Sequence, residues 1–171
     1  MAKKIRPIPK GYRSVTPHLC VKGAADAIKF YKKVFGAKEI MRMPAPGGAV
    51  GHAELMIGDS KIMLADEFPR MGFQSPKAYG GTGVTIHLYV EKVDQVFKRA
   101  LKAGAKERQP VKDQFYGDRS GVVEDPYGHV WNLATHVEDL SPKDMIRRGK
   151  DAASIGSNQP STIDHDRGTS D

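Results

Sequence analysis

Several features that would assign a class of protein at once are scarce or missing in these 171 residues. There is a single cysteine, Cys20, so the chain cannot form an internal disulfide. No apolar run approaches the roughly 18 residues that a membrane-spanning helix needs, and no apolar signal-peptide core follows the basic start. We therefore expect a cytoplasmic protein with no membrane partner.

Acidic residues are missing from positions 1–13, which carry five lysines and arginines. The whole chain has a formal net charge of +7, so most of the excess belongs to this short arm. Nucleic-acid-binding domains instead gather basic and aromatic side chains along a helix or a sheet face. No such stripe is present, and we expect no nucleic-acid partner.

Composition divides the chain into six segments. Two of them, each of more than 50 residues, carry regular apolar patterns, and the other four are an arm, a linker, a short helix and a tail that is expected to be flexible. The segments are a basic arm at 1–13, a first module at 14–67, a linker at 68–83, a second module at 84–136, a helix at 137–150 that starts at Ser141 and Pro142, and a tail at 151–171.

The two long segments match each other in sequence pattern. TPHLCV at 16–21 and TIHLYV at 85–90 are strand-like and begin 69 positions apart (85 − 16). Each is followed by an amphipathic helical pattern, at 25–37 and 93–105, that stops at a glycine, and then by three strand patterns. The sequence thus predicts an α+β fold of two tandem βαβββ modules.

Alternation along the strands gives each module an apolar face and a polar face. The apolar face, which includes Trp131, should pack on the helices. The polar face mixes side chains typical of a concave pocket, although a solvated strand face would alternate in the same way. The candidate pocket residues on the strands are His18, His52, Glu54, His87, Tyr89 and Asn132.

The loop DQFYGDRSG at 113–121 adds Tyr116 and Arg119 to the candidate pocket. A guanidinium there could bind a carboxylate or phosphate of a ligand. Alternatively, a pair between Asp118 and Arg119 braces the turn. His129 follows a predicted turn and is expected at the periphery.

The modules, with HAELMIGDSKIMLADE and the stretch from DQFYGDRSG to GHVWNLATHVEDLSP, closely resemble the vicinal oxygen chelate (VOC) superfamily, in particular its PhnB-like glyoxalase and bleomycin-resistance group. The resemblance covers residues 12–148. It implies a curved sheet closing round a cavity, often completed in a homodimer. Members include metal-dependent lyases, epimerases, extradiol dioxygenases, thiol transferases and metal-free antibiotic-sequestering proteins, so the fold leaves the activity open.

The resemblance also implies where a metal would bind. Metal enzymes of the superfamily take ligands from the first and fourth strands of each module. None of the matching residues is His or Glu, so we expect the usual metal site to be absent. The matching positions are Thr16, Met63, Thr85 and Asn132.

Two functions are compatible with these residues. The first is metal-free binding of an aromatic or amphipathic small molecule in the cavity of a homodimer. The second is a metal-dependent lyase, isomerase or dioxygenase with a shifted site at His18, His87 and Glu54, which would suit Fe, Zn, Ni or Mn. A scaffold role, suggested only by the basic arm, is a third and weaker alternative.

Overall fold

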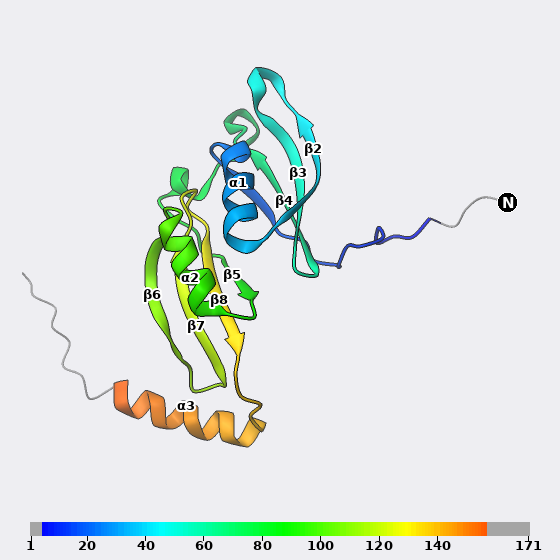
Figure 1. The fold of residues 1–171 in the computed structure, drawn as a ribbon. Helices are drawn as coiled ribbons and strands as arrows, with labels where there is room; N and C mark the ends of the chain where they lie inside the picture. The colour runs from blue at the N-terminus through cyan, green and yellow to red at the C-terminus, as the bar shows by residue number, and fades with distance from the viewer. Residues whose placement is uncertain (1–4, 157–171) are drawn as a thin grey trace, which may run out of the picture.

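The computed structural model describes residues 5–156 and contains two βαβββ modules followed by a helix (Figure 1). The predicted α+β fold with tandem modules is confirmed. The first module comprises β1 (His18–Val21), α1 (Ala24–Phe35), β2 (Lys38–Pro44), β3 (Val50–Ile57) and β4 (Ser60–Asp66). The second comprises β5 (Thr85–Tyr89), α2 (Val93–Lys102), β6 (Lys106–Asp113), β7 (Asp118–Glu124) and β8 (Val130–His136), and α3 (Pro142–Gly156) follows it.

Each module forms one four-stranded mixed sheet with the same strand order. The orders are β1-β4-β3-β2 and β5-β8-β7-β6, and in both sheets the first strand pairs parallel with the fourth. His18 lies opposite Met63 in one sheet, and His87 lies opposite Asn132 in the other. The two histidines therefore hold equivalent positions, as the repeat predicted.

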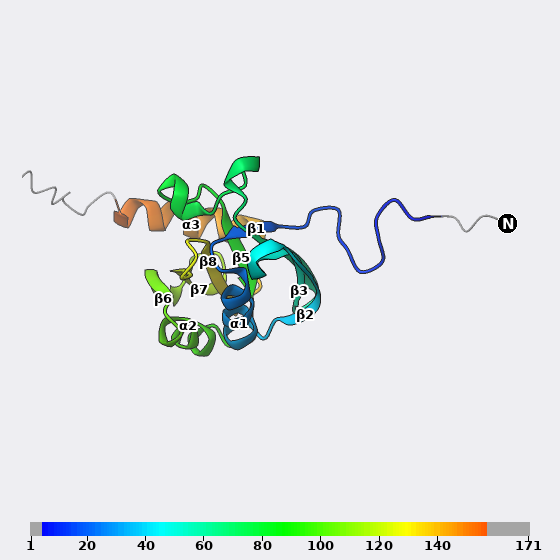
Figure 2. The same cartoon turned by 90° about the horizontal axis from the view of Figure 1, so that it is seen from above.

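Helices α1 and α2 cover one side of the sheets and lie next to each other, as the view from above shows (Figure 2). Their apolar stripes meet the apolar strand faces, and Trp131 is 1% exposed, which confirms its predicted place in the core. The Arg99 guanidinium of α2 donates to the carbonyl oxygen of Val34 in α1 at 2.6 and 2.8 Å. Contacts between the helices thus join the two modules.

A buried carboxylate makes a second joint between the modules. Asp125, 2% exposed, accepts hydrogen bonds from the hydroxyl of Tyr31 in α1 (2.7 Å) and from the indole N–H of Trp131 (2.9 Å). Its other oxygen accepts from the backbone N–H groups of Tyr127 and His129. A buried carboxylate that is satisfied in this way fixes the groups around it.

Local sequence signals explain most element ends. Gly36 closes α1 in a left-handed conformation (φ 67°), and Gly58 supplies the positive φ of the tight turn between β3 and β4. Ser141 Oγ accepts from the backbone N–H of Asp144 at the start of α3 (3.1 Å).

Helix α3 continues past the predicted boundary at residue 150 to Gly156, and the rest of the predicted tail lies outside the described residues. Within residues 5–156, no helix has the length and apolar character needed to cross a membrane.

Candidate functional site

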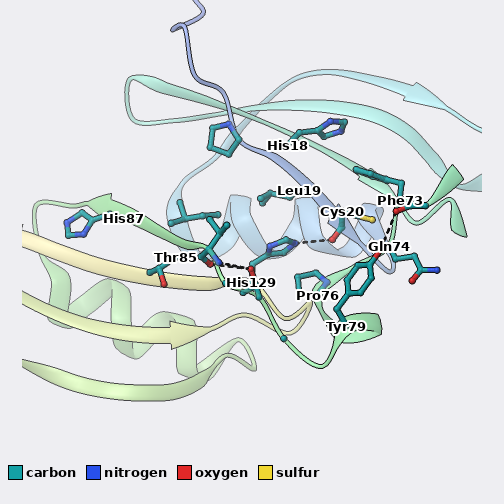
Figure 3. Close-up of a pocket in the computed structure, with 17 residues that line it drawn as sticks. His18, Leu19, Cys20, Phe73, Gln74, Pro76, Tyr79, Thr85, His87 and His129 are labelled. Carbon is teal, nitrogen blue, oxygen red and sulfur yellow. Dashed lines mark hydrogen bonds between the residues drawn. The ribbon is translucent and has the colours of Figure 1, made fainter.

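A cleft of about 710 Å³ lies between the two modules (Figure 3). It is bounded by β1, by β5, by the segment between β4 and β5, and by His129. None of the 17 lining residues is Lys, Arg, Asp or Glu. They are Pro17, His18, Leu19, Cys20, Gly72, Phe73, Gln74, Pro76, Tyr79, Gly81, Thr82, Gly83, Val84, Thr85, Ile86, His87 and His129.

Two of the predicted pocket residues, His18 and His87, line this cleft together. Each stands on the first strand of its module, which is an edge strand of its sheet, so the cleft runs along the two edges. The amide nitrogen of Asn132 donates to Nδ1 of His87 (3.2 Å), which places this predicted residue directly behind the cleft wall.

The imidazole of His18 lies in an apolar corner of the cleft. Its ring centroid is 5.1 Å from that of Phe73 and 5.7 Å from that of His52. Burial lowers the pKa of His18, and the neighbouring His52 lowers it further. At neutral pH this ring is uncharged and can accept or donate a hydrogen bond.

The segment expected to be only a linker forms a wall of the cleft. Glu67, at the end of β4, accepts from the hydroxyl and the backbone N–H of Ser75 (2.5 and 2.9 Å), which folds the segment back on β1. This brings Phe73 and Tyr79 to the cleft. Sequence reasoning missed both residues, and the only signal was that they, like Phe68, are aromatic residues within a Gly- and Pro-rich stretch.

The expectation that His129 is peripheral was wrong. Its side chain is buried, and Nε2 donates to the carbonyl oxygen of Cys20 in the first module (3.0 Å). Cys20 itself is buried, and burial together with the nearby Glu67 and Asp66 carboxylates raises the pKa of its thiol to about 11. At neutral pH the group is a thiol and lacks the thiolate character of a nucleophile.

Two further candidates, His52 and Glu54, lie on the polar face of the first module and outside the cleft lining. Glu54 pairs with Lys61 (3.3 Å) and lies 3.7 Å from the His52 ring, and the Lys61 ammonium is 3.8 Å from the ring centroid of Tyr12. The Tyr12 hydroxyl and then Lys61 lower the pKa of Glu54 against the opposing effect of burial. The carboxylate is therefore ionised and already engaged.

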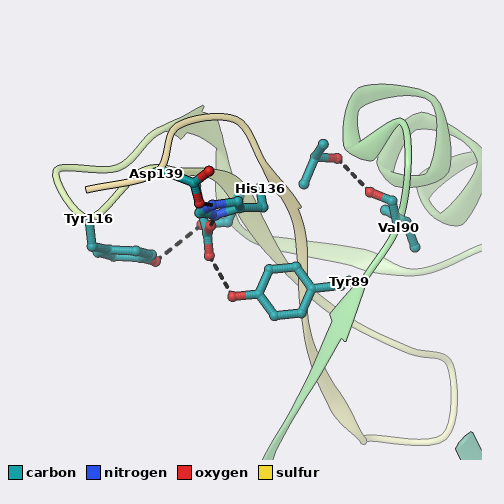
Figure 4. A network of polar contacts seen from close by, with 8 residues as sticks. Tyr89, Val90, Tyr116, His136 and Asp139 are labelled. Atoms are coloured by element: carbon teal, nitrogen blue, oxygen red, sulfur yellow. Dashed lines mark hydrogen bonds and ion pairs between the residues drawn. The ribbon is translucent and has the colours of Figure 1, made fainter. Parts of the chain in front are cut away.

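On the second module, a polar network holds Tyr89 (Figure 4). Its hydroxyl donates to Asp118, 3% exposed, at 2.8 Å, and His136 bridges Asp118 (2.8 Å) and Asp139 (3.0 Å). Both carboxylates raise the pKa of His136, Asp118 first. Sequence reasoning missed this network.

The two loop candidates, Tyr116 and Arg119, lie away from the cleft. The hydroxyl of Tyr116 is 3.5 Å from that of Ser120, beside the network just described. The Arg119 guanidinium binds both oxygens of Asp94 at 2.8 Å and Asp113 at 2.9 Å. Arg119 thus braces β7 against the start of α2, and its partners are these two carboxylates rather than Asp118.

The matching paired modules and the comparisons with known proteins agree. A family model described as the Glyoxalase/Bleomycin resistance protein/Dioxygenase superfamily matches residues 13–133. The chain therefore belongs to this superfamily, the VOC superfamily.

Relatives fit the same assignment. The uncharacterized protein Mb0911c of Mycobacterium bovis is 48% identical over 131 residues, which is 75% of this chain and 86% of the relative. The crystal structure of TioX from Micromonospora sp. ML1 matches with a TM-score of 0.57 and 27% identity, over 75% of this chain and 100% of TioX. A PhnB protein from Bacillus cereus, at 19% identity and TM-score 0.58 over 72% of this chain and 99% of its own, shares the fold.

The residues present do not fit the divalent metal of the metal-dependent members. The strand positions implied by the resemblance hold no imidazole or carboxylate. Within residues 5–156, no group of three or more His, Cys, Asp and Glu side chains could hold a metal ion, so His18, His87 and Glu54 are not gathered into one site. We assign none of this chain's chemistry to such an ion.

Proposed function

We propose that this protein binds an uncharged small molecule with an aromatic or other apolar part in the cleft between its modules, without a divalent metal. The observation that carries the proposal is a lining without Lys, Arg, Asp or Glu, in a chain of which 27% of residues are of these four types. A phosphate, phosphonate or carboxylate buried there would lose its hydration and meet no lysine or arginine.

The lining offers the contacts that an uncharged ligand needs. Leu19, Phe73 and Ile86 provide apolar and aromatic surface, while His18 and Thr85 provide hydrogen-bonding groups. Small-molecule sites commonly combine apolar walls with few polar groups in about 300–1,000 Å³. The cleft has this composition and size.

The proposal includes the homodimer and the cytoplasmic location expected from the sequence. Met43 and Tyr89, on the polar faces of the two sheets, leave more than half of their surface exposed, and a second copy could cover them. The single cysteine agrees with a reducing compartment. Sedimentation equilibrium tests the dimer separately, and a monomer at all concentrations would remove that part alone.

Calorimetric titration with two naphthalenes tests ligand binding. We expect the neutral probe 2-naphthol to bind and its anionic analogue 2-naphthoate to bind at least about tenfold more weakly. A tenfold difference in affinity corresponds to about 1.4 kcal/mol of binding free energy. Equal affinity of the two probes, or no binding of 2-naphthol, would contradict the proposal.

A pair of phenylalanine variants locates the bound probe. Phe73→Leu removes an aromatic wall of the cleft and should weaken 2-naphthol binding about fivefold, within the range of one aromatic contact. Phe115→Leu changes a ring next to Gly149, away from the cleft, and should leave the affinity unchanged. Equal effects of the two variants would show that the probe binds elsewhere.

A further inference from the structure

Sulfur is distributed unequally between the two modules. The strands of the first module contain Met41, Met43, Met56 and Met63 as well as Cys20, whereas β5, β6, β7 and β8 contain no methionine or cysteine. The repeat itself does not require this difference, because the backbone topology is the same.

Strand register places part of this sulfur beside imidazoles. His18 is directly opposite Met63 on the neighbouring strand, and Met63 is opposite Glu54. Residues paired in this way project from the same face of the sheet, about 5 Å apart. His52, two residues before Glu54 on β3, projects from that face too, diagonal to Met63. The Met63 side chain therefore projects from the sheet face that carries both imidazoles.

The separation of the two imidazoles suits a shared ion. Their ring centroids are 5.7 Å apart. Two imidazoles that bind one metal through nitrogen at about 2.0–2.1 Å have centroids roughly 4.5–6 Å apart, depending on the angle at the metal. The His18 and His52 rings stand at such a distance.

We propose that His18, His52 and Met63 form a binding site for Cu(I). Two imidazoles and a thioether are soft enough for this ion, whereas a divalent ion such as Zn²⁺ favours imidazole, thiolate or carboxylate. The Phe73 ring, with its centroid 5.1 Å from that of His18, adds apolar surface beside the site. Glu54 is held by Lys61, so it is not counted among the ligands.

Anaerobic titration of the full chain with Cu(I) against the chromogenic chelator bicinchoninate tests the site. We expect one equivalent to be retained, and the His18→Ala and Met63→Leu variants to bind at least about tenfold more weakly. Met63→Leu conserves side-chain volume, and His18 is exposed, so both variants should fold. Circular dichroism of the copper-free proteins checks this.

The second module supplies a matched control. His87→Ala changes the equivalent histidine, opposite Asn132 instead of a methionine, and should leave Cu(I) affinity unchanged. Cys20→Ser should also leave it unchanged. Complete removal of copper by the chelator, equal losses in His18→Ala and His87→Ala, or no effect of Met63→Leu would each overturn the site. None of these outcomes depends on 2-naphthol binding, so the two proposals can fail separately.

Discussion

In both modules a side chain at the end of the fourth strand caps the start of the helix, but the capping group differs between the two. At the end of β4, the carboxylate of Asp66 accepts from the backbone N–H groups of Gly23 and Ala24 (2.9 and 2.8 Å), which lie at the start of α1. At the end of β8, 69 residues later (135 − 66), the Thr135 hydroxyl accepts from the N–H of Val93 at the start of α2 (2.9 Å). The fourth strand caps the helix in both modules, so the duplicated fold conserves a role and not a residue type.

The polar faces differ far more than the scaffolds. The first presents methionines, two imidazoles and the Glu54–Lys61 pair under Tyr12, whereas the second presents the Tyr89, Asp118 and His136 network. Since the polar face of each sheet does not pack against the helices, the modules can diverge there without losing the fold. The proposed Cu(I) site lies on the face where the modules differ.

The largest effect on the free energy of unfolding is expected at Asp125, which has no counterpart in the first module. Asp125→Ala would leave the Tyr31 hydroxyl, the Trp131 N–H and two backbone N–H groups without their acceptor. Stability should fall by about 3 kcal/mol or more, because buried donors left unpaired each carry a desolvation cost. Urea unfolding of the variant measures the loss.

The exposed carboxylate of the corresponding turn in the first module is the control for Asp125. Asp59→Ala should change stability by less than about 0.5 kcal/mol, as surface substitutions usually do. Similar losses for the two variants would mean that the buried joint carries no special weight.

The next largest effect is expected at the cap of α1. Asp66 also accepts from the backbone N–H of Val50 (2.7 Å), so Asp66→Ala removes three hydrogen bonds to one carboxylate. We expect a loss of about 2 kcal/mol in urea unfolding, at the upper end for a helix cap. A loss below that of its second-module equivalent would break the comparison.

Thr135→Val tests that equivalent with a side chain of the same shape. It removes the bond from Val93 and the bond to the carbonyl oxygen of Val90 (2.7 Å). We expect a loss of about 1 kcal/mol, because a neutral hydroxyl is the weaker cap. Thr135→Ser, which keeps the hydroxyl, should recover most of the stability.

The smallest effect is expected in the pH dependence of stability that His136 of the second module produces. Asp118 and Asp139 raise the pKa of His136 in the folded state, so its stabilising effect is complete below the unfolded pKa and is lost as pH rises through the folded value. The stability difference between wild type and His136→Gln should therefore be larger at pH 5 than at pH 9. Guanidinium unfolding at both values measures it.

Tyr89→Phe is the control for this pH dependence, because it removes the other partner of Asp118 without removing a group that titrates in this range. Hydrogen bonding to Asp118 raises the pKa of Tyr89 above its usual value near 10. Its stability difference from wild type should be the same at pH 5 and pH 9. A larger difference at pH 9 than at pH 5 for His136→Gln would reverse the assigned sign.

The sequence predicted the repeat because strand alternation, helix periodicity and glycine stops such as Gly36 are local signals. It could not predict the cleft wall. Phe73 reaches the cleft because Glu67 accepts hydrogen bonds from Ser75, and this contact forms only when the chain folds. The partners of Arg119 were missed for the same reason. Alternation shows which face a side chain occupies, and it does not show which distant loop or carboxylate meets it.

One carboxylate oxygen of Asp125 accepts hydrogen bonds from both modules, and this affects how the protein unfolds. Tyr31 from one half and Trp131 from the other donate to that same atom, so separating the halves takes the Tyr31 hydroxyl away from its acceptor. A fragment of the first half alone would contain this hydroxyl without its acceptor, and a fragment of either half would expose the surface buried at the joint. We therefore expect the two modules to unfold together in one cooperative transition. We also expect the two modules, if expressed as separate fragments, to depend on each other for solubility.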